Sequence, residues 1–190
     1  RMLDDQVAGI TIVGNGADEV IRLVCLAFLS EGDPVAASQY GFIRFRQQAG
    51  MMGAKVTEVP MRGWRHDLDA MAEACTNRTK AVFIVSPNNP TGTFTSELEL
   101  RRFLARVSRS TLVLLDEAYC HYAAARPDYH GRSVPELVLR HPNLLVLRTF
   151  SKAYGLAGLR AGYGVGDPEL IRVLDKIRMP FNVNLPAQFA

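Results

Sequence analysis

The sequence contains four short segments in which reactive side chains lie beside glycines, prolines or hydroxyl residues. They cover residues 14–19, 86–93, 116–119 and 148–160. Each segment follows a run of apolar residues, so each is expected where a buried strand ends. A lysine and a carboxylate at such positions are groups with which an enzyme can bind and activate a small organic ligand.

Residues 14–19 read G-N-G-A-D-E, a glycine turn that opens a helix. The free N–H groups at a helix N-terminus, together with the helix dipole, suit a phosphate. The alternative is that Asp18 or Glu19 only caps the helix. The segment lacks the third glycine of the dinucleotide fingerprint, because residue 19 is Glu, and it lacks the Gly-Lys-Ser/Thr of a P-loop.

Residues 86–93 read S-P-N-N-P-T-G-T and follow the run 80–85, in which every residue after Lys80 is apolar. Two prolines and a glycine make a rigid turn, which can hold an amide side chain at a fixed point. A tight loop that binds no ligand is the alternative.

Two charged residues follow runs that are expected to be buried. Asp116 follows four consecutive apolar residues, 112–115. Burying a carboxylate there costs free energy unless it meets a cation or hydrogen-bond donors. Asp116 therefore either belongs to a structural ion pair or binds a positively charged group. Lys152 follows the apolar run 144–147 and two hydroxyl residues, and Arg160 lies eight positions further on.

Taken together, these groups describe one ligand. A lysine can form an imine with an aldehyde. An aspartate can keep a pyridine nitrogen protonated, which makes the ring an electron sink. An amide and a phenol can bind a ring hydroxyl, while Thr, Ser, Arg and a helix N-terminus bind a phosphate. The ligand that presents all of these groups is pyridoxal 5′-phosphate.

Three motifs in the chain resemble those of the fold-type I, class I/II aminotransferases. They are S-P-N-N-P-T-G (86–92), D-E-A-Y (116–119) and R-T-F-S-K-A-Y-G-L-A-G-L-R-A-G-Y (148–163). The resemblance covers essentially all 190 residues and, within the superfamily, is strongest to the histidinol-phosphate aminotransferases. It implies an α/β fold, a three-layer sandwich with a mostly parallel sheet, which is the large cofactor-binding domain of these enzymes.

The resemblance also implies a role for each site residue. Lys152 is the lysine that binds the cofactor aldehyde and moves a proton between the substrate α-carbon and the cofactor C4′. Asp116 pairs with the pyridine nitrogen, and Asn89 and Tyr119 bind the 3′ oxygen. Tyr40 stacks on the cofactor ring. The phosphate is bound by Thr149, Ser151, Arg160 and the backbone amides of Ala17 and Asp18.

Two segments depart from the family pattern. Residues 38–40 read S-Q-Y where the family has P-T-Y, and residues 120–122 read C-H-Y where histidinol-phosphate enzymes often carry an acidic residue and then Phe. The second departure bears on substrate identity. Residues 178–184, R-M-P-F-N-V-N, resemble a stretch common in histidinol-phosphate enzymes and favour that substrate.

The implied reaction is the transfer of an amino group between L-glutamate/2-oxoglutarate and imidazole-acetol phosphate/L-histidinol phosphate, a step of histidine biosynthesis. The first alternative is an aromatic or other 2-oxo-acid aminotransferase, or a C–S lyase or decarboxylase, on the same fold. The second, from another class, is a non-catalytic aminotransferase-like domain that binds an effector.

The resemblance further implies that residues 1–190 are the large domain of a homodimeric enzyme. The small domain and the N-terminal arm are then expected outside this chain. They would supply the arginine that binds the substrate α-carboxylate and the tyrosine that one subunit lends to the phosphate of the other.

The elements that must position these residues follow from the apolar patterning. Continuous apolar runs alternate with helical patterns, which indicates a mostly parallel sheet covered by helices, with ligands beyond the carboxyl ends of its strands. We predict strands at 9–13, 34–38, 55–59, 80–85, 111–115 and 144–147, and helices at 17–30, 40–52, from 66, at 97–109, 135–140, 168–177 and from 186.

Composition argues against several other classes of protein. The chain has 22 basic and 19 acidic residues, interleaved and with a net charge of +3, so it lacks the basic stripe typical of nucleic-acid binding. Its longest apolar run, 23–29, is too short to span a membrane, and no signal-peptide pattern opens it, so we expect a cytoplasmic protein. Three widely spaced cysteines indicate buried free thiols, and the histidines show no metal-ligand spacing, so no metal is expected.

Overall fold

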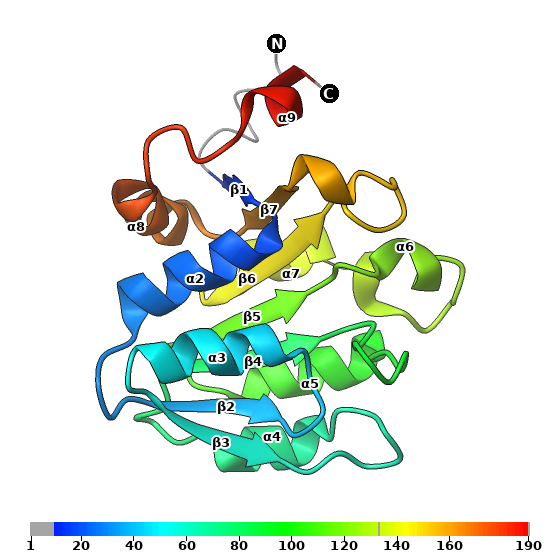
Figure 1. Ribbon diagram of the computed structural model, residues 1–190. Coiled ribbons are helices and arrows are strands. Elements are labelled where there is room, and N and C mark those ends of the chain that lie inside the picture. Colours follow the sequence, from blue (N-terminus) through cyan, green and yellow to red (C-terminus); the bar gives the residue numbers. More distant parts are fainter. Residues whose placement is uncertain (1–9, 133, 190) are drawn as a thin grey trace.

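A seven-stranded sheet runs through the centre of the computed structural model, which describes residues 10–132 and 134–189 (Figure 1). The strand order is β1-β7-β6-β5-β4-β2-β3. Neighbouring strands from β6 to β3 are parallel, and β7 is antiparallel to both β6 and β1. The strands are β1 (Thr11–Asn15), β2 (Pro34–Ser38), β3 (Lys55–Val59), β4 (Ala81–Val85), β5 (Leu112–Asp116), β6 (Leu144–Thr149) and β7 (Ala161–Val165).

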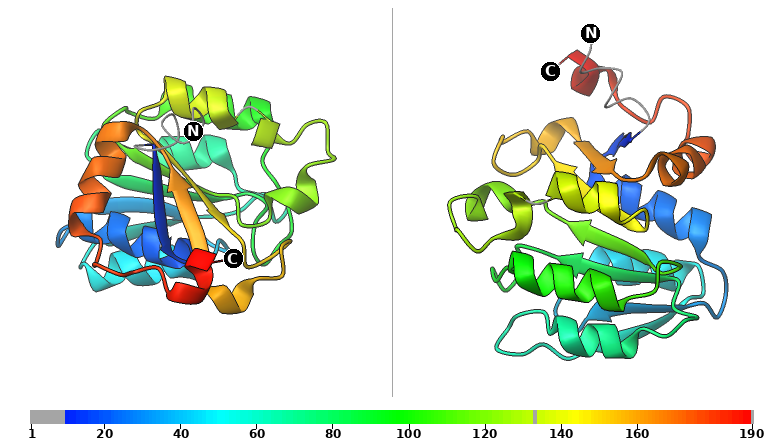
Figure 2. Two further views of the ribbon diagram at one scale, coloured as in Figure 1. Left: turned by 90° about the horizontal axis from the view of Figure 1, so that it is seen from above. Right: turned by 180° about the vertical axis from the view of Figure 1, so that it is seen from behind.

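Helices cover both faces of this sheet, as predicted, so the fold is a three-layer α/β sandwich (Figure 2). The helices are α2 (Ala17–Phe28), α3 (Ile43–Met51), α4 (Leu68–Ala74), α5 (Glu97–Arg106), α6 (Cys120–Ala123), α7 (Val134–Arg140), α8 (Pro168–Ile177) and α9 (Leu185–Phe189). The core on one face contains residues of α2, α3 and α8, and the core on the other contains residues of α4, α5 and α7. Within the described residues, no helix has the length and apolarity needed to cross a membrane.

The central strands show why this arrangement forms. All five residues of β4 are buried, yet they divide between the two cores. Phe83 and Val85 pack under α2 and α3, whereas Val82 and Ile84 pack under α4 and α5. Successive side chains of a strand point to opposite faces, so a continuous apolar run needs a helix layer on each side.

Most predicted elements are confirmed, and the differences have local causes. The strands at 34–38 and 55–59 and the helix at 168–177 have the predicted bounds. The helix predicted from residue 40 begins at Ile43, because the Gly41 amide bonds to Ser38 O and Phe42 has a non-helical ψ of 123°. The strand predicted at 9–13 is Thr11–Asn15, and residue 9 lies outside the described residues.

Strand β7 was not predicted from the sequence. Its sequence, A-G-Y-G-V, has two glycines in five residues and therefore a weak strand signal. The glycines are there because β7 packs very closely against the start of α2. A Cβ added at Gly162 would lie 2.2 Å from Ala17 N, and one added at Gly164 would lie 3.0 Å from Val20 Cγ1. This approach fixes the N-terminus of α2 at the edge of the sheet where β1 ends.

Substituting Gly162 tests that close approach. Gly162→Ala must push apart two backbone segments, so we expect it to lower the free energy of unfolding by at least about 2 kcal/mol, measured by urea denaturation. Gly50→Ala is the matched control, because a Cβ at Gly50 in α3 meets nothing within 4 Å. That change should raise stability by about 0.5–1 kcal/mol. Equal effects of the two substitutions would show that the approach at Gly162 is unimportant.

Candidate active site

The predicted site residues all lie at one edge of the sheet. The carboxyl ends of the parallel strands meet there, β1 runs in the same direction as β6, and the antiparallel β7 begins there. In Figure 1 the arrowheads of β2, β3, β5 and β6 point to this side, where α6 also lies. The ten positions that the structure gathers at this edge are Ala17, Asp18, Tyr40, Asn89, Asp116, Tyr119, Thr149, Ser151, Lys152 and Arg160.

Asp116 is the last residue of β5 and is almost completely buried, with 4% of its surface exposed. Its Oδ1 accepts one hydrogen bond, from the Ala118 amide at 2.9 Å. No basic side chain of the described residues forms an ion pair with it. Burial disfavours the charged carboxylate and raises the pKa of Asp116 from 3.8 to about 6.

Glu117, the next residue, is fully buried, but its charge is compensated. Arg148 Nε and Nη2 lie 2.8 and 2.7 Å from Glu117 Oε2. His130 Nε2 lies 2.9 Å from Oε1, and the Tyr129 hydroxyl donates to the same oxygen at 3.1 Å. Burial alone would raise the pKa of Glu117, but the His130 hydrogen bond and the Arg148 charge outweigh it, and the pKa lies below its ordinary value.

Two adjacent carboxylates therefore have opposite environments. The protein supplies two basic side chains to Glu117 and one backbone amide to Asp116. A buried anion is stable only when paired or hydrogen-bonded, so the cationic partner that Asp116 lacks can come from a ligand. Of the two readings left open by the sequence, a structural ion pair is wrong for Asp116 within the described residues.

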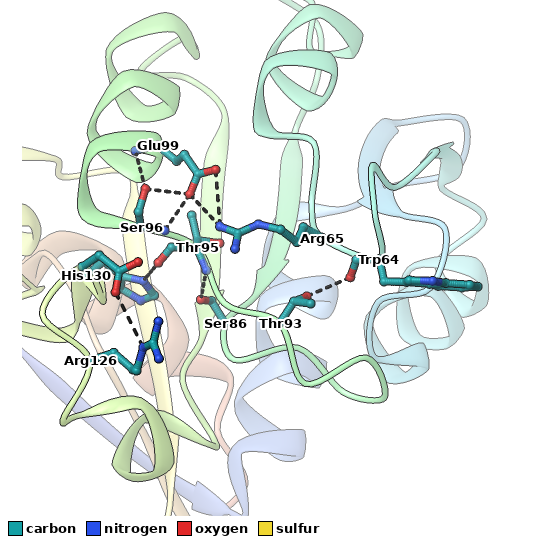
Figure 3. Close-up of polar contacts among 10 residues, drawn as sticks. Trp64, Arg65, Ser86, Thr93, Thr95, Ser96, Glu99, Arg126 and His130 are labelled. Carbon is teal, nitrogen blue, oxygen red and sulfur yellow. Dashed lines mark hydrogen bonds and ion pairs between the residues drawn. The ribbon is translucent and has the colours of Figure 1, made fainter.

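The network around Glu117 was not predicted from the sequence. It connects Glu117 to the loop that follows β4, because Tyr129 OH lies 3.2 Å from Ser86 O and His130 Nδ1 lies 2.9 Å from Thr95 O. The Thr95 amide in turn bonds to Ser86 Oγ at 2.8 Å, as Figure 3 shows. The one available signal was Arg148, a basic residue in the otherwise apolar run that forms β6.

Lys152 and Tyr119 face each other across the site. Lys152 lies in the loop after β6 and is exposed, and its Nζ is 5.3 Å from the centre of the Tyr119 ring. Tyr119 and Asn89 line one open hollow between the loops that follow β5 and β4. A phenol and an amide so placed can bind the same oxygen of a ligand.

The N-terminus of α2 is shaped to bind an anion. Gly16 precedes it with φ of 75°, and its amide bonds to Arg160 O at 2.7 Å. The amides of Ala17 and Asp18 have no acceptor within the described part of the chain. The Asp18 carboxylate does not cap the helix but binds Arg44 through two contacts of 2.7 and 2.9 Å. The two free amides thus remain available to a ligand.

Hydroxyl groups and a guanidinium surround the same place. Thr149 Oγ1 lies 2.9 Å from Ser151 Oγ and accepts from the Ser151 amide at 3.1 Å. Thr149 pairs with Gly162, which contacts the Ala17 amide. The Arg160 guanidinium lies directly over Gly16, because a Cβ there would be 2.5 Å from Nη2. These donors together form a cup, defined by Thr149, Ser151, Arg160 and the amides of Ala17 and Asp18, of a kind that can bind a phosphate.

The structure also shows the state of the three cysteines and the grouping of side chains of metal-ligating type. Cys25 and Cys120 are buried and Cys75 is half-buried, and all three are free thiols. Within the described residues, no group of three or more His, Cys, Asp or Glu side chains could hold a metal ion.

Comparison with known protein families identifies the fold family. The model of the family "Aminotransferase class I and II" matches residues 3–190. The chain belongs to the class I and II aminotransferases. The match includes all of the motifs singled out in the sequence, at 86–92, 116–119 and 148–163.

Individual aminotransferases of known name are also similar. The chain is 46% identical to the histidinol-phosphate aminotransferase of Moorella thermoacetica and 49% identical to that of Bacillus subtilis strain 168, in each case over 94% of this chain. It spans about half of their length, 46% and 49%. The crystal structure of the Sinorhizobium meliloti histidinol-phosphate aminotransferase in complex with pyridoxal-5′-phosphate has a TM-score of 0.83 at 32% identity, over 90% of this chain and 45% of that one.

The environment of Asp116 makes a prediction about stability. A raised pKa means that the folded, ligand-free domain holds a proton that the unfolded chain has lost between about pH 4 and 6, so stability falls as the pH rises through this window. Asp116→Asn removes the charge. We expect it to raise the free energy of unfolding at pH 7.5 by up to about 3 kcal/mol, with little gain at pH 3.5.

The matched control is the neighbouring carboxylate. Glu117→Gln leaves Arg148 and His130 without their anion, so it should lower the free energy of unfolding at pH 7.5 by about 3–5 kcal/mol. Both changes in the free energy of unfolding are to be measured by denaturant unfolding of the ligand-free protein. Destabilisation by Asp116→Asn at pH 7.5 would contradict the account of Asp116.

Proposed function

We propose that this chain is the cofactor-binding domain of a pyridoxal 5′-phosphate-dependent aminotransferase. The observation that carries the proposal is the buried Asp116 carboxylate, which forms no ion pair with a basic side chain of the described residues and is influenced only at longer range by the Lys152 charge. The protonated nitrogen of the cofactor ring would be its cationic partner. The bound cofactor in the similar S. meliloti structure supports the same assignment.

The remaining groups fit the rest of the cofactor. Asn89 and Tyr119 share one hollow and would bind the ring oxygen. Tyr40, which is 45% exposed in the loop after β2, would stack on the ring. The phosphate would be held by the donors of the cup, namely Thr149, Ser151, Arg160 and the amides of Ala17 and Asp18.

When bound, the cofactor supplies an electron sink for the charge that develops at the substrate α-carbon. The chain's own residues would do the rest. Asp116 would keep the ring nitrogen protonated. Lys152 Nζ would bind the cofactor aldehyde, and its amine would also carry a proton between the substrate α-carbon and the cofactor C4′.

For the substrates, the proposal is amino transfer between L-glutamate/2-oxoglutarate and imidazole-acetol phosphate/L-histidinol phosphate. The names of the relatives at 46–49% identity support it. So does the stretch 178–184, which is tied to the site. Asn182 Nδ2 donates to Val13 O at 3.0 Å and to Glu19 Oε2 at 2.8 Å, next to the start of α2.

The proposal extends to the state of the protein in the cell. We place it in the cytoplasm as a homodimer whose partners are small amino acids and 2-oxo acids rather than nucleic acid or membrane. Residues 1–190 would be the large domain. The substrate-carboxylate arginine and the tyrosine exchanged between subunits would belong to the N-terminal arm and small domain outside it.

Substrate identity is tested with the natural polypeptide that contains this sequence. With 2-oxoglutarate as acceptor, kcat/KM for L-histidinol phosphate should exceed that for phenylalanine or tyrosine by at least about tenfold. A preference for the aromatic amino acids would instead support the first alternative. Binding of an amino acid without turnover would support an effector-binding domain.

The role of Lys152 is tested by two lysine variants of the same polypeptide. Lys152→Ala should abolish the absorbance of covalently held cofactor and lower turnover by roughly 10²- to 10⁴-fold, because both the anchoring amine and the proton carrier are lost. Lys176→Ala, on the exposed side of α8, should leave both unchanged. Covalently held cofactor in Lys152→Ala would refute the assignment.

A further inference from the structure

Two aromatic rings from different loops touch at the rim of the site. Tyr40 follows β2, and Trp64 follows β3. Their ring centres are 5.6 Å apart, with 46° between the planes. Tyr40 is 45% exposed and Trp64 is 64% exposed, so neither ring is part of the core. Trp64 is the single tryptophan of the 190 residues.

A chain of hydrogen bonds through the loop after β4 joins the backbones of these two residues. Asn88 Nδ2 donates to Tyr40 O at 3.1 Å and to Thr91 Oγ1 at 2.8 Å. Thr91 Oγ1 lies 3.0 Å from Thr93 Oγ1, and Thr93 Oγ1 donates to Trp64 O at 2.8 Å. Because the Thr93 proton goes to Trp64, Thr91 must donate to Thr93, so the donations run outward from the Asn88 amide, in one direction to Tyr40 and in the other through Thr91 and Thr93 to Trp64.

The backbone of Trp64 is unusual for its residue type. Arg62 and Arg65 exchange two backbone hydrogen bonds of 3.1 Å, which closes a two-residue turn. Both turn residues have positive φ, 55° at Gly63 and 61° at Trp64. Such turns favour Asn or Gly, and a bulky side chain there is strained. Strain of this kind is retained where a side chain has a function.

The turn is held firmly on both sides. Arg65 Nη2 pairs with Glu99 Oε2 at 3.1 Å on α5. His66, the next residue, is buried and contacts Ser38 Oγ and Val85 O at the ends of β2 and β4. Figure 3 shows the Trp64 indole pointing away from Thr93, so the loop holds the backbone of Trp64 and leaves its ring to contact Tyr40.

We propose that Trp64 is a positioning residue for Tyr40. Its indole packs against the Tyr40 ring and limits the orientations that this ring can adopt. The hydrogen bonds through Asn88, Thr91 and Thr93 hold the backbones of both residues in a fixed position relative to the loop that carries Asn89. This inference rests on the proposed function, in which Tyr40 stacks on the cofactor ring. On this proposal, Trp64 affects cofactor binding only through its contact with Tyr40.

A double-mutant cycle in the natural polypeptide tests this statement. The readouts are the dissociation constant of pyridoxal 5′-phosphate and the circular dichroism of its absorption band. Trp64→Ala should raise the dissociation constant on the order of 2- to 10-fold and weaken the dichroic band, as expected for loss of one aromatic pair. Trp64→Phe should restore most of both, and in a Tyr40→Ala background Trp64→Ala should add nothing.

Two further variants separate positioning from folding. Asn adopts a positive φ with less strain than Trp does. The thermal midpoint of Trp64→Asn should therefore equal or exceed that of the wild type, while its cofactor binding should be as weak as that of Trp64→Ala. Leu139→Ala, which removes an 83% exposed side chain on α7, is the control and should change neither readout.

The outcomes distinguish this inference from the function on which it rests. Additive effects of the Tyr40 and Trp64 substitutions, unchanged cofactor binding in Trp64→Ala, or loss of the dimer with an unchanged dichroic band would each overturn the positioning role and leave the proposed function standing. A wild-type polypeptide that binds no pyridoxal 5′-phosphate would overturn both.

Discussion

The burial of the Asp116 carboxylate is the constraint around which this domain is arranged. All five residues of β5 are buried, and the strand ends in an anion whose side chain accepts one backbone hydrogen bond. The adjacent Glu117 shows what the fold does when it must neutralise a buried acid, because it receives Arg148 and His130. Asp116 forms no such ion pair, which costs stability and leaves its charge available to a ligand.

The proposed phosphate cup depends on backbone contacts rather than on side-chain packing. Gly162 brings β7 against the Ala17 amide, and Gly16 leaves room for the Arg160 guanidinium. Thr149 pairs with Gly162, so the hydroxyl groups after β6 and the amides of α2 are in register across three strands. The distance between the carboxylate and the cup is thereby set by the order of strands in the sheet.

Much of this arrangement could be predicted from the sequence, because its signals are local. Continuous apolar runs identified the buried parallel strands, and polar residues directly after them identified the site, as at Asp116. The antiparallel β7 could not be predicted, because its glycines serve a contact with α2 that no local pattern reveals. The Glu117 network was missed for the same reason. Glu117, the adjacent pair Tyr129 and His130, and Arg148 come from three separate parts of the sequence and meet only when the chain folds.

The most direct test of the central claim is an NMR titration of the Asp116 side-chain carboxyl with and without pyridoxal 5′-phosphate. Without cofactor, we predict a pKa of about 6, set by burial. With cofactor bound, the pKa should fall to or below the ordinary aspartate value of about 4, because a ring cation then stabilises the charged form. The same pKa in both states would contradict the claim that Asp116 is held for a cationic ligand.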